Sequence, residues 1–154
     1  MSDSRELKLE RVVEAPRDLL WMCWTEPKHL MPWFCPKPWT VSECRIDLKP
    51  GGEFYTMMNS PEGGKFPNNG VFLEVIPGQK LVWTDAYTVG WQPVENPFFT
   101  AIVEFADAGA GKTKYTARVR HWTLENAKKH AEMGFEGGWG TALEQLVEYT
   151  RSLK

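Results

Sequence analysis

The amino-acid sequence predicts an α+β domain in which an antiparallel sheet of about six or seven strands packs against a long C-terminal helix. Between residues 39 and 121, short segments of strand type are separated by turn signals, and no helical periodicity is long enough to compete. Two short helices are predicted after the first strand, between residues 16 and 31. Beyond residue 123, apolar residues recur at steps of three and four, the pattern of a helix laid against a sheet.

The N-terminal elements follow from alternation and from the positions of proline. Apolar and polar residues alternate over residues 7–13, as in a half-buried strand, with Arg11 as the exception on the apolar face. Pro16 suits the first turn of a helix, which the apolar residues 19–24 continue until Pro27 ends or interrupts it. A second helical turn at residues 28–31 and an aromatic loop at residues 32–36 are expected next.

The middle of the chain is predicted to be a meander of short strands. The expected strands are residues 41–48, 53–59, 71–76, 81–87, 99–105 and 113–122. Turns are expected at residues 50–52, 60–64, 67–70, 77–78 and 109–111, with a longer loop at 88–97 and a mobile tip between the second and third turns. Phe54, Thr56 and Met58 share one face, and His121 points the same way as the apolar residues of the last strand.

The C-terminal helix carries the clearest apolar stripe in the sequence. Its members are Phe135, Trp139, Ala142, Leu143, Leu146, Val147 and Thr150. Thr123 is a suitable N-cap for the helical region, because its hydroxyl can accept a hydrogen bond from a free amide of the first turn. Four glycines between residues 134 and 140 either break the helix or permit its close approach to the sheet.

Composition narrows the class of protein. The 154 residues are expected to form a single domain, residues 1–154, and a 13% aromatic share with eight Trp predicts a bulky core or a pocket lining. A formal charge of −2 with scattered Lys and Arg predicts no nucleic-acid partner and no membrane surface. The polar start and the short apolar stretches resemble neither a signal peptide nor a membrane span, so a cytoplasmic location is expected.

Motifs for catalysis and metal binding are weak. Cys23, Cys35 and Cys44 lack C-x-x-C spacing and are interpreted as reduced thiols, with a reactive Cys35 as the alternative. The three histidines lack metal-ligand spacing, no serine lies in a G-x-S-x-G elbow, and Gly111 precedes a strand rather than the helix that a phosphate loop requires. We therefore predict no catalytic residue, no metal and no cofactor, and leave open whether the chain is an enzyme.

Short sequence motifs along nearly the whole length of the chain resemble those of a known family. The matching positions are Ala15-Pro16-Arg17, Trp21, Trp24-Thr25-Glu26-Pro27, Trp33, Asp47-Leu48-Lys49-Pro50-Gly51-Gly52, Gly70, Pro77, Leu81-Val82, Gly111-Lys112-Thr113 and Gly138-Trp139. They resemble the homologues of activators of the ninety-kilodalton heat-shock protein's ATPase, a branch of the START or birch-pollen-allergen (SRPBCC) superfamily. The resemblance implies a helix-grip fold, in which a curved antiparallel sheet wraps around the long helix and encloses a hydrophobic cavity. Members of the superfamily carry lipids, bind hormones, or act as cyclases and dehydratases.

The first functional hypothesis is a binding protein whose internal cavity takes a small hydrophobic or aromatic ligand. The cavity-lining residues predicted from strand and helix parity are Trp33, Phe54, Met58, Trp83, Phe99, Val103, Val119, His121, Trp139 and Leu143. In this hypothesis His121 and an indole N–H orient the ligand, although a buried histidine is more often a satisfied core residue.

Two alternatives remain open. The second hypothesis is an enzyme of cyclase or dehydratase type, in which His121 moves protons with help from Arg11, Asp47 or Glu104; it requires an ionisable partner within hydrogen-bond reach of His121. The third is a protein-interaction module, either a chaperone ATPase regulator or a homodimer, with Trp91 and Phe98 as exposed contacts.

Overall fold

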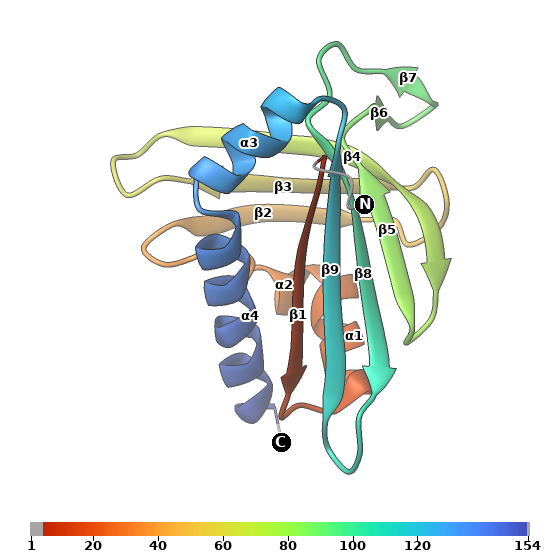
Figure 1. Cartoon of the computed structure of the whole chain (residues 1–154), viewed down its shortest axis with the longest axis vertical. Coiled ribbons are helices and arrows are strands. Elements are labelled where there is room, and N and C mark those ends of the chain that lie inside the picture. The colour runs from red at the N-terminus through yellow and green to blue at the C-terminus, as the bar shows by residue number, and fades with distance from the viewer. Residues whose placement is uncertain (1–4, 154) are drawn as a thin grey trace.

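A curved antiparallel sheet of seven strands forms the body of the computed structural model, which describes residues 5–153 (Figure 1). The elements are β1 (Glu6–Val13), α1 (Arg17–Thr25), α2 (Pro27–Leu30), β2 (Thr40–Ile46), β3 (Glu53–Asn59), β4 (Lys65–Ile76), β5 (Lys80–Thr84), β6 (Tyr87–Thr88), β7 (Gln92–Pro93), β8 (Phe99–Asp107), β9 (Thr113–His121), α3 (Leu124–Glu132) and α4 (Phe135–Arg151). The strand order is β1-β9-β8-β5-β4-β3-β2, so β1 and β2 are the edges.

The sheet bends so far that β2, β3 and β4 run across the direction of β1, β9 and β8 (Figure 1). α4 contacts β1 and α1, and α1 contacts β8 and α2. The predicted fold class is confirmed: a curved antiparallel sheet, two short helices after the first strand, and a long C-terminal helix.

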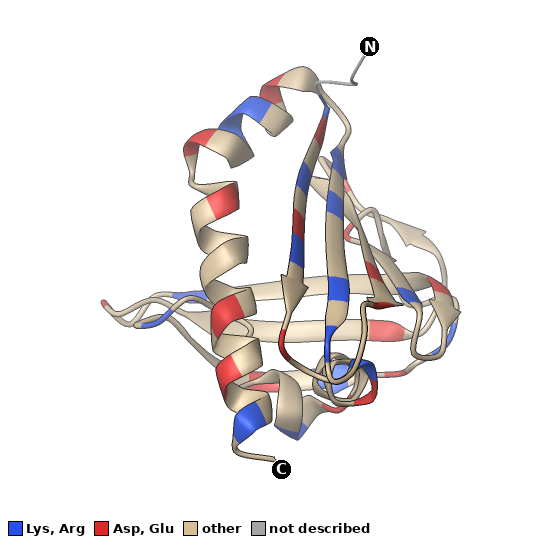
Figure 2. Ribbon diagram, turned by 60° about the horizontal axis from the view of Figure 1, so that its bottom comes forward, with Lys and Arg blue, Asp and Glu red and all other residues tan. Residues whose placement is uncertain are grey.

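Alternation along the strands separates a packed inner face from a charged outer face. On β9 the inward residues Tyr115, Ala117 and Val119 are at most 2% exposed. The outward residues form cross-strand ion pairs such as Arg120–Glu6 at 2.8 Å and Arg118–Glu104 at 2.7 Å. Figure 2 shows Lys and Arg residues intermixed with Asp and Glu residues along these strands, which therefore offer no continuous basic surface.

The helical region is broken into α3 and α4 at Gly134, whose φ of 94° belongs to the left-handed region that favours glycine. The N-cap prediction is confirmed, since the Thr123 hydroxyl accepts a hydrogen bond from the backbone N–H of Asn126 at 3.0 Å. Close approach to the sheet does not explain the other glycines. A Cβ added at Gly137, Gly138 or Gly140 would meet no atom within 4 Å.

The predicted turn at residues 67–70 is wrong, because these residues belong to the twelve-residue strand β4. The first half of β4 pairs with β3, whereas β5 joins β4 only from Val71 onward. Pro67 therefore lies where one side of β4 has no neighbouring strand, the position in which a residue without an N–H is tolerated. Gly70 is required by close approach, since a Cβ there would lie 2.4 Å from the carbonyl oxygen of Thr84.

The open space around Gly140 allows a stability prediction. Gly140 lies within α4, and its ideal Cβ meets nothing within 4 Å, so alanine should fit without strain. Gly140→Ala should raise the free energy of unfolding by about 0.5–1 kcal/mol through helix propensity and the smaller entropy of the unfolded chain. Urea unfolding measures this; a lower midpoint than that of the wild type would contradict the geometry.

Candidate ligand pocket

A pocket of about 880 Å³ lies between the inner face of the sheet, the loop after α2, and the N-terminal half of α4. Its volume is within the range of about 300–1,000 Å³ that is usual for small-molecule sites. Most of its wall is aromatic or aliphatic, and the floor is contributed by β3, β5 and β9. The exposed residues Trp39 and Met133 stand at its rim.

Seven of the ten residues predicted to line a cavity line this pocket: Trp33, Phe54, Met58, Trp83, Phe99, Trp139 and Leu143. Val103 and Val119 do not, because they lie where the sheet is closely packed and both are fully buried in the core. His121 is also absent from the lining; it is 4% exposed and stands behind His130, which does line the pocket.

Aromatic rings form a continuous wall. Trp24 lies edge-on to Trp33 with ring centroids 5.0 Å apart and also contacts Trp83 at 5.1 Å. The Trp83 and Trp139 rings are nearly parallel, at 15°, with centroids 6.4 Å apart. Flat apolar faces of this kind favour a flat apolar or aromatic guest.

Two indole N–H groups in this wall have no hydrogen-bond partner among the described residues. They belong to Trp24 and Trp33, whose side chains are 1% and 2% exposed. Burial raises the pKa of the Tyr115 hydroxyl, and the neighbouring Trp24 indole opposes this increase without reaching hydrogen-bond geometry. An unmet buried donor costs about 1–3 kcal/mol, so the wall holds polar capacity that the protein itself does not use.

A single side chain of α4 fastens the aromatic loop that forms one wall. The amide nitrogen of Gln145 donates to the backbone oxygens of Trp33, at 3.0 Å, and Cys35, at 2.7 Å. Its amide oxygen accepts from the backbone N–H of Lys37 at 2.9 Å. The loop is thus tied to the helix that it faces. In the sequence, Gln145 is only one polar residue of an amphipathic helix, so these hydrogen bonds, which latch the loop to α4, were not predicted.

The opposite end of the pocket carries a pair of histidines. His121 Nδ1 lies 2.7 Å from the backbone oxygen of Arg5, and His121 Nε2 lies 2.9 Å from His130 Nδ1. Burial, together with the charge that His121 would carry, lowers the pKa of His130 to about 4. His130 is therefore a neutral imidazole near neutral pH.

Asp85 stands beside these histidines and also lines the pocket. Burial raises its pKa, while backbone hydrogen bonds and His121 oppose the increase. Its carboxylate accepts from the backbone N–H groups of Phe98 and Phe99 at 2.9–3.2 Å. The rings of Phe98 and Phe99 in turn pack on His121 and His130.

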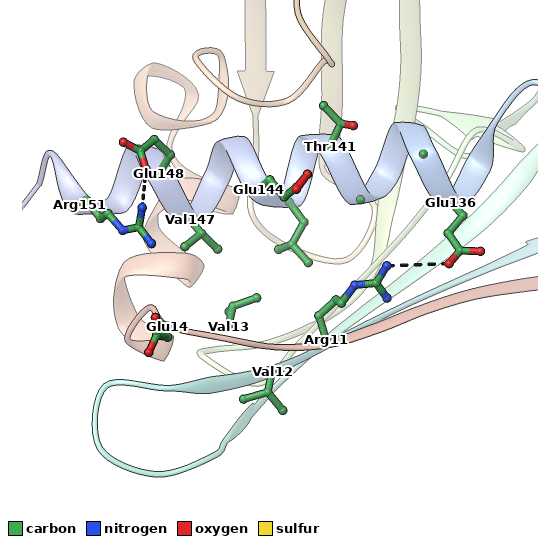
Figure 3. A pocket seen from close by; sticks show the side chains of 13 residues that line it. Arg11, Val12, Val13, Glu14, Glu136, Thr141, Glu144, Val147, Glu148 and Arg151 are labelled. Atoms are coloured by element: carbon green, nitrogen blue, oxygen red, sulfur yellow. Dashed lines mark hydrogen bonds and ion pairs between the residues drawn. The ribbon is translucent and has the colours of Figure 1, made fainter.

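The other polar residues considered from the sequence lie elsewhere. Glu104 pairs with Arg118 on the outer face, and Asp47 pairs with Lys49 at 3.6 Å on the surface. Arg11 points toward α4 and pairs with Glu136 at 3.8 Å (Figure 3). None of the three reaches His121, whose ionisable partner is His130 instead.

Arg11 and Glu136 border a second, open hollow of about 750 Å³ between β1 and α4 (Figure 3). Charged side chains of α4, including Glu144, Glu148 and Arg151, line it. The opposite side is formed by residues 11–13 of β1. Glu136 is largely exposed, so solvent screens these charges. An inward-pointing arginine on an edge strand is a known means of discouraging pairing with another sheet.

The thiols and potential metal ligands complete the survey. Burial raises the pKa of Cys35, which borders the pocket, to about 11, so its thiol is not a ready nucleophile near neutral pH. Cys23 and Cys44 are likewise free thiols. Residues 5–153 contain no cluster of three or more His, Cys, Asp or Glu side chains that could hold a metal ion. In the same part of the chain, no helix has the length and apolar character needed to cross a membrane.

The chain is similar in sequence and in fold to known proteins. Residues 14–151 match the family described as activator of Hsp90 ATPase homolog 1-like protein. A crystal structure of a protein from Nitrosomonas europaea is 45% identical, with a TM-score of 0.94, over 99% of this chain and 97% of that one. No functionally curated protein matches the chain.

More distant solved structures share the fold. A crystal structure of a protein from Mycobacterium smegmatis is 22% identical, with a TM-score of 0.79, over 95% of this chain and 90% of that one. The solution structure of an AHSA1-like protein from Aeromonas hydrophila is 20% identical, with a TM-score of 0.71, over 96% of this chain and 93% of that one.

The lowered pKa of His130 predicts a pH dependence of stability. The folded protein holds this proton less tightly than the unfolded chain, so the stabilisation is complete above about pH 6.5 and is lost as the pH falls toward 4. The contribution is on the order of 2 kcal/mol. His130→Asn, which removes the titrating group and can still donate to His121, should lose less stability over this interval. Urea unfolding across that pH range measures both slopes; equal slopes would contradict the assignment.

Proposed function

Because the chain belongs to the family of activator of Hsp90 ATPase homolog 1-like proteins, within the START superfamily, we propose that it binds a small hydrophobic or aromatic molecule in the pocket between sheet and α4. The supporting observation is the pocket of about 880 Å³ walled by Trp24, Trp33, Trp83 and Trp139, in a molecule whose core is otherwise closely packed. The ligand-binding residues are those that line this pocket.

Burial of the ligand supplies the affinity. An aromatic molecule that buries about 200 Å² of apolar surface gains roughly 5 kcal/mol from its transfer out of water, before the costs of association. The rings of Trp83 and Trp139 offer flat contact area, and the latch from Gln145 holds the facing loop in place. A wall that is already ordered loses little entropy when the ligand enters.

The alternative of an enzyme of cyclase or dehydratase type has one specific observation in its favour. His121 has an ionisable partner, His130, at 2.9 Å, and it also interacts electrostatically with Asp85. A neutral His130 is suited to accept a proton rather than to donate one. Binding nevertheless explains the whole lining, whereas the histidines explain only one end of it.

A protein-interaction role rests on the exposed surface instead. The small hairpin of β6 and β7 projects from the sheet (Figure 1) and exposes Tyr87, Val89 and Trp91. Phe98, expected as an exposed contact, is only partly exposed and packs on His130. A monomer by light scattering together with an unchanged chaperone ATPase rate would remove the homodimer and regulator alternatives.

We further propose a cytoplasmic location, which the three free thiols support because a reducing compartment keeps cysteines in that state.

Introducing a charge into the pocket wall tests the binding proposal. Trp139→Glu should abolish the fluorescence increase of the neutral probe N-phenyl-1-naphthylamine, because a carboxylate in an apolar wall is costly to desolvate. Trp91→Glu is the matched control, since Trp91 is 52% exposed and lies outside the pocket. Unchanged probe uptake by a folded Trp139→Glu protein, shown by its circular dichroism, would exclude this pocket as the site.

A further inference from the structure

Hydrogen-bond chemistry fixes where the protons of the two histidines lie. A carbonyl oxygen can only accept, so His121 must donate from Nδ1 to the backbone oxygen of Arg5, 2.7 Å away. In a neutral His121 the other nitrogen, Nε2, then carries a lone pair. The nitrogen 2.9 Å from it, His130 Nδ1, must therefore be the donor.

This chain of donors leaves one atom free at its end. With its proton on Nδ1, a neutral His130 presents a lone pair at Nε2. No described residue hydrogen-bonds that atom, and it is not fully buried. Since the His130 ring lines the pocket, Nε2 is an acceptor that a guest can reach.

We propose that the His121–His130 pair makes this end of the pocket a hydrogen-bond acceptor, so that the pocket selects small aromatic molecules carrying a hydroxyl group that donates to Nε2 of His130. The inference rests on the proposed binding function and names the class of its ligand. Phe99 stacks on the His130 ring, at 12° with centroids 5.6 Å apart, and so fixes the direction of the lone pair. The backbone oxygen of Arg5 is the first acceptor in this series of hydrogen bonds. The positions of the protons on the two histidines therefore do not depend on a mobile side chain.

The order of protons depends on the charge of His121. If His121 takes a second proton, its Nε2 donates, His130 Nδ1 accepts, and the proton of His130 moves to Nε2. Asp85 is the acidic group that interacts electrostatically with His121, and Arg5 supplies the carbonyl. The test is therefore performed at about pH 8, above the ordinary pKa of an imidazole.

Two matched probes distinguish the contribution of the hydroxyl group to binding from that of the aromatic ring. 2-Naphthol can donate a hydrogen bond, whereas 2-methoxynaphthalene cannot, and their apolar surfaces are similar. The measured quantity is the ratio of the Kd of the methoxy probe to that of the naphthol. This ratio should fall about fivefold to tenfold from the wild type to His130→Asn, which has no acceptor in the place of Nε2. His29→Asn is the matched control, because His29 bonds to Tyr149 outside the pocket, and its ratio should equal that of the wild type.

Each other outcome has a distinct meaning. If both probes bind and the ratio is the same in wild type and His130→Asn, the acceptor inference is overturned while the binding proposal stands. If neither probe binds the wild type, the binding proposal itself fails, and the inference fails with it.

A measurement on the wild type avoids dependence on a variant. In nitrogen-15 spectra of the histidines at the same pH, both rings should show protons on Nδ1, and 2-naphthol alone should shift His130 Nε2. A proton on Nε2 of His130 in the free protein would overturn the inference.

Discussion

The structure depends on how α4 meets the curved sheet: buried residues hold its C-terminal half to the core, whereas its N-terminal half, apart from the buried Phe135, borders the pocket. Leu143, Leu146 and Thr150 are buried against the core, at 3%, 0% and 0% exposed. At the other end, Gly137 and Gly138 border the pocket and leave room for atoms that no neighbour occupies. The packed half supplies the stability that allows the open half to persist, since an apolar void left by itself lowers stability.

The polar groups around the pocket are also found at two separate ends. Tyr115 and His121 are both inward residues of β9, and the six residue steps from one to the other correspond to about 20 Å along the strand. Indole and phenol donors therefore stand at one end, and the histidine pair stands at the other. Gln145 joins the aromatic loop to α4 at the indole end, where it bonds to the backbone oxygen of Trp33. The arrangement suits an elongated apolar guest that is recognised at the histidine end, because the two indole N–H groups are buried from contact.

Much of this fold follows from periodicity, because burial on one face dictates the spacing of apolar residues. The strand at residues 53–59 and the apolar stripe of α4 were predicted for that reason, whereas the Thr123 cap was predicted from the chemistry of its hydroxyl. Parity also selected seven lining residues, but it cannot say where along a strand packing gives way to a pocket. Val103 and Val119 face inward between the levels of Tyr115 and His121, yet they are fully buried in the core and do not line the pocket.

The contacts that most define the site were beyond sequence reasoning. His130 lies on a helix rich in Lys and Glu, and its contact with His121 depends on the angle at which α3 leaves β9. No spacing rule gives that angle. The hydrogen bonds of Gln145 span more than a hundred residues, and the strand at residues 67–70 is formed by pairing with β3. Each is a long-range geometric fact without a local signal.

The eight tryptophans allow the central claim, that the guest enters between sheet and α4, to be tested in one titration. Each indole N–H gives its own signal in a proton–nitrogen correlation spectrum. On addition of N-phenyl-1-naphthylamine, the account predicts shifts at Trp24, Trp33, Trp39, Trp83 and Trp139, which line the pocket. The signals of Trp91 and Trp122, exposed and outside it, should stay in place. Shifts confined to Trp91 and Trp122 would contradict the account.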